Sequence, residues 1–336
     1  LQAFYEYQTL ICMLTGMEVS NASLYEGATA AAEAVLMARA ITGRRGVVVS
    51  SAVHPHTREV LATYLKELPI DIVVVETLDG RIRPEDLRQA VNDQTAAVLI
   101  QTPNVFGCVE SLDQFSAIAH GAGAIVIASV DPISCVLLKR PGDLGADIVV
   151  GDAQPLGIPM SYGGPSCGFM ACREQFMRKM PGRLVGATRD RAGRRAFCLT
   201  LQTREQHIRR ERATSNICTN QGLLALRVAI YLSAMGRRGL AQVASMCLDK
   251  AHYAAQKLSD LSGFELRFQA PFFKEFVVRT TKGVDRVLAH CRSRGIQAGV
   301  PLAPWYEDLA DSFLVAVTEK RTRAEIDAWA KALSEV

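Results

Sequence analysis

The sequence predicts an α/β protein with a mainly parallel sheet covered by helices and a smaller α/β domain at its C-terminal end. Apolar runs recur at intervals of roughly 25 residues, and candidate helices separate them. Continuous apolar strands that alternate with helices are typical of a parallel sheet buried on both faces. The five runs are Val47–Val49, Ile72–Val75, Ala97–Ile100, Ile125–Ile127 and Ile148–Val150.

Length and composition exclude several classes of protein. The 336 residues, 49% of them hydrophobic, suffice for a large core. No apolar run approaches the roughly 20 residues of a membrane helix, so no membrane partner is expected. The nine cysteines contain no CxxC pair, which indicates free thiols in a reducing cytoplasm and no metal site.

Charge points to a protein partner more than to nucleic acid. A net charge of +4 is too small to indicate nucleic-acid binding. The stretch from Arg178 to Arg212 is the most basic of the chain. It is either a solvated charged face or a surface for an acidic partner, since complementary charge selects partners and speeds association.

The N-terminal part predicts two helices before the first strand. Apolar residues at helical spacing between Leu1 and Leu14 follow no capping residue, so we expect the chain to begin inside a helix and to be truncated at its N-terminus. Gly27, Ala28 and Thr29 then open an alanine-rich helix that runs to about Ala40. Free backbone N–H groups at such a helix start can bind a phosphate, although Gly and Thr also serve there as caps.

The later elements follow the same reasoning. Helices are predicted between the strands at 55–68, 84–91 and 112–120, and none of the strands is followed by a GxGxxG motif, which disfavours a dinucleotide site. Two apolar helices, 221–235 and 239–261, meet at Gly236. We therefore expect a large domain at 1–220, connecting helices at 221–262 and a small α/β domain at 263–336.

Polar residues directly after the strands are candidate ligand contacts, because the carboxyl ends of parallel strands are where ligands bind. His54 follows the first run and Asp131 the fourth. His54 and His56 lack a third metal ligand at suitable spacing, so a structural histidine is favoured over a metal site. Asp131 can equally well cap the turn that begins at Pro132.

The most informative stretch is 151–168, GDAQPLGIPMSYGGPSCG. Its prolines and glycines exclude a helix and an ordinary strand, and apolar runs flank it on both sides. A glycine-rich loop between buried strands suits the floor of a pocket, where a ligand or another backbone comes close.

This loop resembles the lysine loop of the glycine decarboxylases, the P-proteins of the glycine cleavage system, which are fold type I pyridoxal-phosphate (PLP) enzymes. Pro159 and Gly163-Gly164-Pro165 match the family's motif, and Gln154 falls at the position of the lysine that binds the cofactor covalently. Glutamine cannot form an imine. The opening EYQTLICMLTGMEVSNASLYEGATAAAEAVLMA and the later LTLQTREQHIRRERATSNICTN resemble the alpha subunits of two-subunit P-proteins, so the resemblance covers essentially the whole chain.

The resemblance implies a fold type I PLP-transferase-like fold and roles for specific residues. This chain would itself contain a vestigial PLP pocket. In that pocket the phosphate of PLP would lie at Gly27, Ala28 and Thr29, its ring beside His54 and its pyridinium nitrogen beside Asp131. A second group of residues in this chain would instead reach the phosphate of PLP bound to a partner. This group consists of Arg212, Thr214, Ser215 and Asn216. Thr214 to Asn216 could also simply cap the helix that begins near Asn220.

The function implied is that of the alpha subunit of a glycine decarboxylase, inactive by itself. The beta subunit, in an α2β2 assembly, would supply the lysine and the PLP, and the aminomethyl group from glycine would pass to the lipoyl arm of H-protein. Two alternatives stay open at this point. The chain could be a scaffold that binds a PLP enzyme without touching its site, or an autonomous enzyme that holds PLP without a lysine.

Overall fold

The computed structural model describes residues 1–213, 215–217 and 220–336. Contacts between residues divide the chain into two units. The first unit contains Leu1–Glu76, Ile82–Thr102 and Ser111–Leu240, and the second contains Thr77–Arg81, Pro103–Glu110 and Ala241–Val336. The domain limits expected from the sequence stay a prediction.

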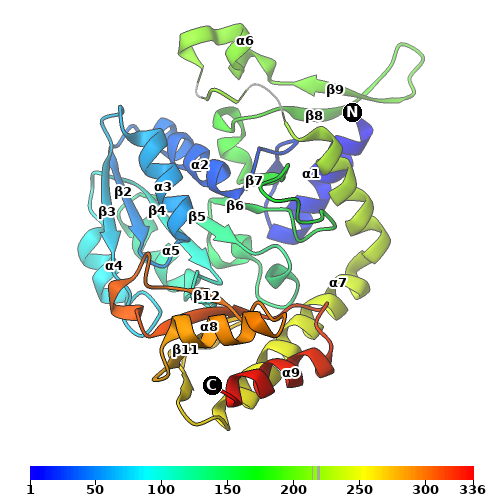
Figure 1. Ribbon diagram of the computed structural model, residues 1–336. Helices are drawn as coiled ribbons and strands as arrows, with labels where there is room; N and C mark the ends of the chain where they lie inside the picture. The colour runs from blue at the N-terminus through cyan, green and yellow to red at the C-terminus, as the bar shows by residue number, and fades with distance from the viewer. Residues whose placement is uncertain (214, 218–219) are drawn as a thin grey trace. The chain divides into compact units, whose positions relative to one another are not determined.

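A seven-stranded sheet forms the centre of the first unit, with the order β1-β7-β6-β5-β4-β2-β3 (Figure 1). Strands β2 to β6 pair in parallel, whereas β7 runs antiparallel to both of its neighbours. All five apolar runs of the sequence are strands of this sheet, which confirms the predicted fold class. The strands are β1 (Val19–Ser20), β2 (Gly46–Ser50), β3 (Asp71–Val75), β4 (Thr95–Thr102), β5 (Ile125–Val130), β6 (Ile148–Asp152) and β7 (Gly168–Cys172).

Helices cover both faces of this sheet. Alternate strand residues such as Val47, Leu99 and Ile127 join the core cluster that contains α2 (Gly27–Thr42) and Leu61 of α3 (Pro55–Leu65). The residues between them, such as Val98 and Val126, face the other way and are equally buried. Burial on both faces explains why β2, β4, β5 and β6 are continuously apolar instead of alternating, whereas the edge strand β3 is apolar but mostly exposed. The other helices of the first unit are α1 (Gln2–Thr15), α4 (Pro84–Ala90), α5 (Leu112–Gly121) and α6 (Gln206–Arg209).

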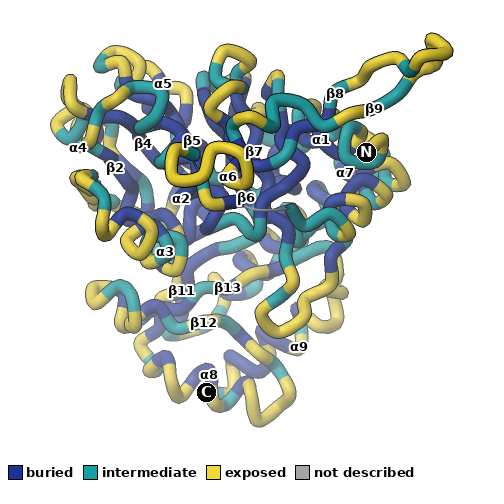
Figure 2. Tube along the Cα trace, turned by 90° about the horizontal axis from the view of Figure 1, so that it is seen from above, coloured by how far each residue is buried: buried dark blue, intermediate teal, exposed yellow. Residues whose placement is uncertain are grey.

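A two-stranded hairpin, β8 (Leu184–Arg189) and β9 (Arg195–Thr200), follows β7 in the first unit. Phe197 lies against Tyr5 of α1, and the hairpin tip is exposed (Figure 2). Arg194 pairs with Asp190 across the turn at 2.9 Å. The tip is therefore one exposed part of the basic stretch recognised in the sequence, and residues 206–212 are another.

Helix α7 (Gly222–Ser259) continues from the first unit into the second and is interrupted at Gly236 (φ 58°, ψ −177°). This confirms the helix break expected at Gly236. A backbone with positive φ is accessible to glycine without the steric cost that a Cβ atom brings. No helix within the three described ranges is long and apolar enough to cross a membrane.

The second unit has a four-stranded antiparallel sheet in the order β10-β11-β13-β12. The second half of α7 packs with α8 and α9 in one core that also includes sheet residues such as Phe313. A capping box between Thr322 and Glu325 starts α9. The elements are β10 (Phe264–Leu266), β11 (Glu275–Thr280), α8 (Val284–Ser293), β12 (Val300–Pro301), β13 (Ser312–Ala316) and α9 (Arg323–Ser334).

Candidate functional site

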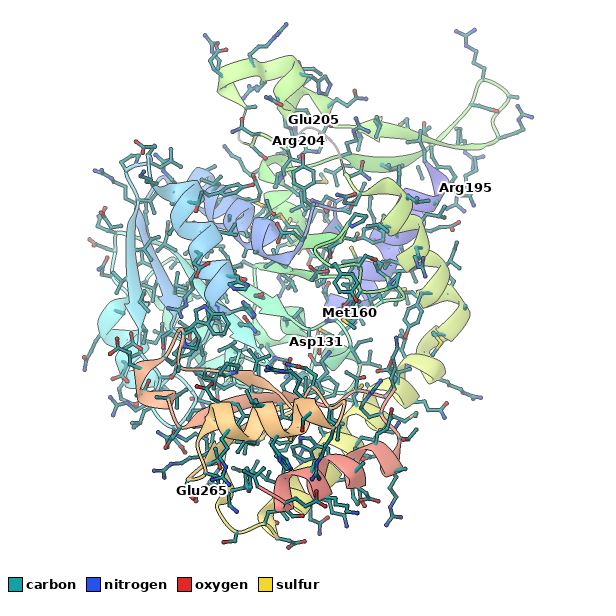
Figure 3. All side chains as sticks on the ribbon, in the orientation of Figure 1. Asp131, Met160, Arg195, Arg204, Glu205 and Glu265 are labelled. Carbon is teal, nitrogen blue, oxygen red and sulfur yellow. The ribbon has the colours of Figure 1, made fainter. Side chains whose placement is uncertain are left out.

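The glycine-rich loop lies at the carboxyl end of the parallel strands, between β6 and β7. It lines a pocket of about 710 Å³, to which Asp152, Gln154 and residues 159–166 contribute. Met160 and Tyr162 are almost fully exposed at its rim, and Figure 3 labels Met160 together with Asp131 at the end of β5. The loop is therefore placed where α/β sheets bind ligands.

Gln154 uses both of its donor groups inside this loop. Its backbone N–H donates to Asp152 Oδ1 at 2.8 Å, and its side-chain Nε2 donates to the carbonyl oxygen of Ile158 at 2.7 Å. The side chain at the position of the expected lysine thus stabilises the turn of the loop, and it offers no amine for a covalent link.

Two carboxylates occupy the N-terminus of α2, where the sequence predicted a phosphate site. Glu26 is the N-cap residue, and its carboxylate accepts from Ala28 N at 2.6 Å and from Thr29 N at 2.9 Å. Asp152 Oδ2 lies 3.4 Å from Gly27 N. A glutamate that caps its own helix satisfies the free N–H groups and complements the positive end of the helix dipole.

Asp152 joins this helix end to the glycine-rich loop. Its Oδ1 accepts the Ser166 hydroxyl at 2.7 Å in addition to the Gln154 N–H. Burial raises the pKa of Glu26, opposed by the two backbone N–H groups, and the nearby charge of Asp152 raises it further. The structure therefore joins Gly27 and Gln154 in one hydrogen-bond network through the carboxylate of Asp152, and the carboxylate of Glu26 lies at the same helix end.

His54 and Asp131 lie at the expected strand ends and have local partners. His54 is the N-cap residue of α3, where its Nδ1 accepts from His56 N at 3.2 Å, and its own N–H donates to Gln101 Oε1 at 2.8 Å. Asp131 Oδ1 accepts from Ile133 N at 3.0 Å. The contacts with His56 N and Ile133 N are local, each to the residue two positions on, and whether either His54 or Asp131 meets a ligand stays a prediction. Among the described residues, no group of three His, Cys, Asp or Glu side chains could hold a metal ion.

PLP, the cofactor that the fold implies, does not fit this pocket. Its phosphate dianion would have to enter a helix N-terminus whose N–H groups already bind carboxylates, and like charges at this distance repel each other. Its aldehyde would meet the amide of Gln154. The misfit thus involves the phosphate position as well as the covalent link.

The segment after Arg212 carries the second group of candidates. Arg212 is exposed and lies 3.9 Å from Glu211, and Asn216 is exposed as well. Ser215 Oγ accepts from Ile217 N at 3.0 Å, and Ser215 lies near Glu33 of α2, where it acts to lower the pKa of that carboxyl group. Thr214 lies outside the described residues. Arg212 and Asn216 thus have exposed side chains, while Ser215 is half-buried and its oxygen accepts a backbone N–H of this chain.

Three acidic residues of the site were not identified from the sequence: Glu26, Asp152 and Glu33. Only Glu26 carries a local signal, because a negative charge directly before a helix complements the positive end of the helix dipole. Asp152 reaches a glycine 125 positions earlier, and Glu33 reaches a serine 182 positions later. Such contacts follow from the fold and not from a local pattern.

Comparison with known proteins gives a consistent result. The family model described as "Glycine cleavage system P-protein" matches residues 1–333. The chain is 50% identical, over 336 residues, to a probable glycine dehydrogenase (decarboxylating) subunit 1 of Desulforamulus reducens, and 52% identical, over 335 residues, to that of Chlorobium chlorochromatii. Each match includes at least 99% of this chain and 75% of the length of the relative.

Solved structures agree with these relatives. A glycine decarboxylase (P-protein) of the glycine cleavage system, in inhibitor-bound form, superposes with a TM-score of 0.95 at 44% identity, over 100% of this chain and 75% of that one. A glutamate decarboxylase of Lactobacillus brevis superposes with a TM-score of 0.74 at 14% identity, over 99% of this chain and 79% of that one, and shares the fold alone.

Proposed function

Because the chain belongs to the family of glycine cleavage system P-proteins, in the branch called subunit 1, we propose that it is the alpha subunit of a two-subunit glycine decarboxylase. The complete enzyme would decarboxylate glycine and pass the remaining aminomethyl group to the lipoyl arm of H-protein. The beta subunit would bind PLP covalently, and the complex would be a cytoplasmic α2β2 heterotetramer.

The observation that carries this proposal is the content of the chain's own pocket. Gln154 stands where the lysine is expected, and Glu26 with Asp152 binds the backbone N–H groups at the expected phosphate site. These groups argue against the alternative of an autonomous enzyme that holds PLP without a lysine. A glycine decarboxylase that contains this chain needs a second subunit for its cofactor.

An exposed apolar face on the first unit supports a partner subunit. Leu223 and Ile230 on the outer side of α7 are 79% and 60% exposed, and Leu226 lies between them at helical spacing. The glycine-rich loop lies beside this helix, because the Arg227 side chain donates to the carbonyl oxygen of Gly157. Contiguous exposed apolar residues of this kind mark protein interaction sites. We therefore assign this face, together with Met160 and Tyr162, to the beta subunit.

The contribution of this chain to catalysis would be positional. PLP withdraws electrons from an attached amino acid, which allows carbon dioxide to leave. Arg212, Thr214, Ser215 and Asn216 would add hydrogen bonds to the phosphate held by the beta subunit, and the loop would keep water away from the reacting atoms. Hydrogen bonds to a charged group contribute about 1.5 to 3 kcal/mol each, so losing two of them would weaken cofactor binding by about 100-fold or more.

The experiment is reconstitution with the beta subunit, followed by glycine–bicarbonate exchange and by measurement of PLP affinity. Alanine at both Ser215 and Asn216 should lower PLP affinity by about 100-fold. Alanine at Ser293, an exposed serine of α8 in the second unit, is the matched control and should leave it unchanged. Full affinity and full exchange activity in the double variant would instead support a scaffold that binds the enzyme without touching its site.

A further inference from the structure

The second unit contains a cavity beside the end of β13. On one side of β13 the pairing with β11 continues as far as Glu275 and Ala316. On the other side the pairing with β12 ends at Leu314, and the chain before β12 is not paired with β13. A cavity of about 410 Å³ is lined there by residues 295–298, the end of β13 and the start of α9. The cavity therefore lies where one strand of the sheet is shorter than its neighbour.

The backbone of Ala316 points towards this cavity. In an antiparallel ladder, the hydrogen-bonding groups of successive residues point to opposite sides of the strand. Val317 N donates to Lys274 O on the β11 side at 2.9 Å, so the N–H and C=O groups of Ala316 point to the side where β12 has ended. Ala316 is exposed, and these two groups have no hydrogen-bond partner among the described residues. The end of β13 thus offers one donor and one acceptor to a ligand.

Arg321 adds a positive charge at the same cavity. Its side chain is 51% exposed, and its Nη1 lies 3.4 Å from Glu325 Oε1. The other carboxylate oxygen of Glu325 accepts the N–H of Thr322 at 2.7 Å and its hydroxyl at 3.0 Å, at the start of α9. In the described parts of the chain, no other group hydrogen-bonds to the Arg321 guanidinium. The N–H groups that remain suit an anionic ligand, because charge-assisted hydrogen bonds are the stronger ones.

Apolar side chains form much of the wall. Ile296, Val315 and Ile326 line the cavity together with Trp329, which is 7% exposed. The indole N–H of Trp329 is buried, and no group that the structure describes accepts it. Buried donors rarely lack an acceptor, so this donor is available to a ligand atom at that wall. A cavity of this volume, with apolar walls and a few polar groups, is typical of small-molecule sites.

We propose that this cavity binds a small carboxylate with a branched apolar body. The carboxylate accepts the Ala316 N–H and pairs with Arg321, and the apolar body packs against Ile296 and Trp329. An amino group on the ligand donates to the Ala316 carbonyl oxygen. A strongly polar body is disfavoured, because it would place polar groups against apolar walls. The site lies wholly within the second unit and does not depend on the function proposed above.

The test is a titration of the full chain with leucine and with 4-methylpentanoate, which has the same branched body but no amino group. Trp329 is the fluorescent reporter in a Trp305→Phe background, since the chain has two tryptophans. Saturable binding with a Kd of about 1 mM or lower is expected for at least one of the two acids. Leucinamide, which has no carboxylate, should bind at least about tenfold more weakly.

Two variants test the two polar contacts. Arg321→Gln should weaken binding about tenfold to 100-fold, because it removes the charge that pairs with the carboxylate. Ala316→Pro should weaken it about tenfold, because proline lacks the N–H, and no ladder hydrogen bond is lost at this position. Arg292→Gln is the matched control. Arg292 is an exposed arginine of α8 that does not line the cavity, so this change should leave binding unaltered.

Each outcome supports or overturns the proposal. Binding of 4-methylpentanoate, alone or with leucine, would show that the carboxylate and the branched body suffice, whereas binding of leucine alone would add the Ala316 carbonyl oxygen as the acceptor of the amino group. The proposal is overturned if neither acid binds saturably, or if leucinamide binds as tightly as the acids. Full affinity in both Arg321→Gln and Ala316→Pro, or equal weakening by Arg292→Gln and Arg321→Gln, would also overturn it.

Discussion

Replacement of Glu33 by glutamine should change how stability depends on pH. Burial raises the pKa of Glu33 from 4.5 to about 7. Between these two values the unfolded chain has released the proton while the folded chain retains it, so the stability of the folded state falls as pH rises. At about 1.4 kcal/mol for each pH unit, the loss reaches about 3 kcal/mol at pH 7 and then levels off.

Glutamine cannot ionise, so Glu33→Gln should lack this loss. The free energy of unfolding of the variant, minus that of the parent chain, should therefore increase by about 3 kcal/mol between pH 4.5 and 7. Trp305 and Trp329, the two tryptophans, both lie in the second unit. Because neither tryptophan lies in the first unit, urea unfolding should be followed by amide exchange of α2, which contains Glu33.

Glu325→Gln in the second unit provides a control of opposite sign. The backbone N–H of Thr322 in the capping box lowers the pKa of Glu325, so its contribution is present at neutral pH and is lost as pH falls. The stability of this variant relative to the parent chain should therefore decrease as pH rises. A difference between Glu33→Gln and the parent that does not change with pH would refute the assignment of Glu33 as a buried acid with a raised pKa.

Two further predictions concern the pocket and the partner face. Gln154→Lys alone should form little borohydride-stable pyridoxyl product. The double variant Gln154→Lys with Glu26→Ser should bind PLP at least about tenfold more tightly than Gln154→Lys, because a repelling carboxylate is removed. Equal PLP binding by the two variants would show that Glu26 does not exclude the phosphate. Glutamate at both Leu226 and Ile230 should weaken binding of the beta subunit at least about tenfold in a titration. Val300→Glu, at an exposed apolar position of the second unit, should not weaken it, and unchanged binding of the double variant would place the partner elsewhere.

The fold was predictable where the pattern of side chains is local. The five parallel strands are continuous apolar runs, and the helix break at Gly236 follows from the residue type. Strands β1 and β12, of two residues each, carry no periodic signal and were missed. The order of strands in the sheet also depends on long-range pairing, which no local pattern encodes.

The site was predictable only in part, for the same reason. Resemblance placed Gln154 at the lysine position, and the structure shows its amide engaged within the loop. The acidic groups at the start of α2 were missed, because a glycine-rich helix start is compatible with both a phosphate and a capping carboxylate. Only the folded chain brings Asp152 to Gly27 and Ser215 to Glu33.

The most direct test of the central claim is borohydride reduction of the reconstituted complex, followed by peptide mass spectrometry of both subunits. The account predicts a pyridoxyl group on one lysine of the beta subunit and none on any lysine of this chain. A pyridoxyl-lysine in this chain, formed in proportion to glycine–bicarbonate exchange activity, would contradict it.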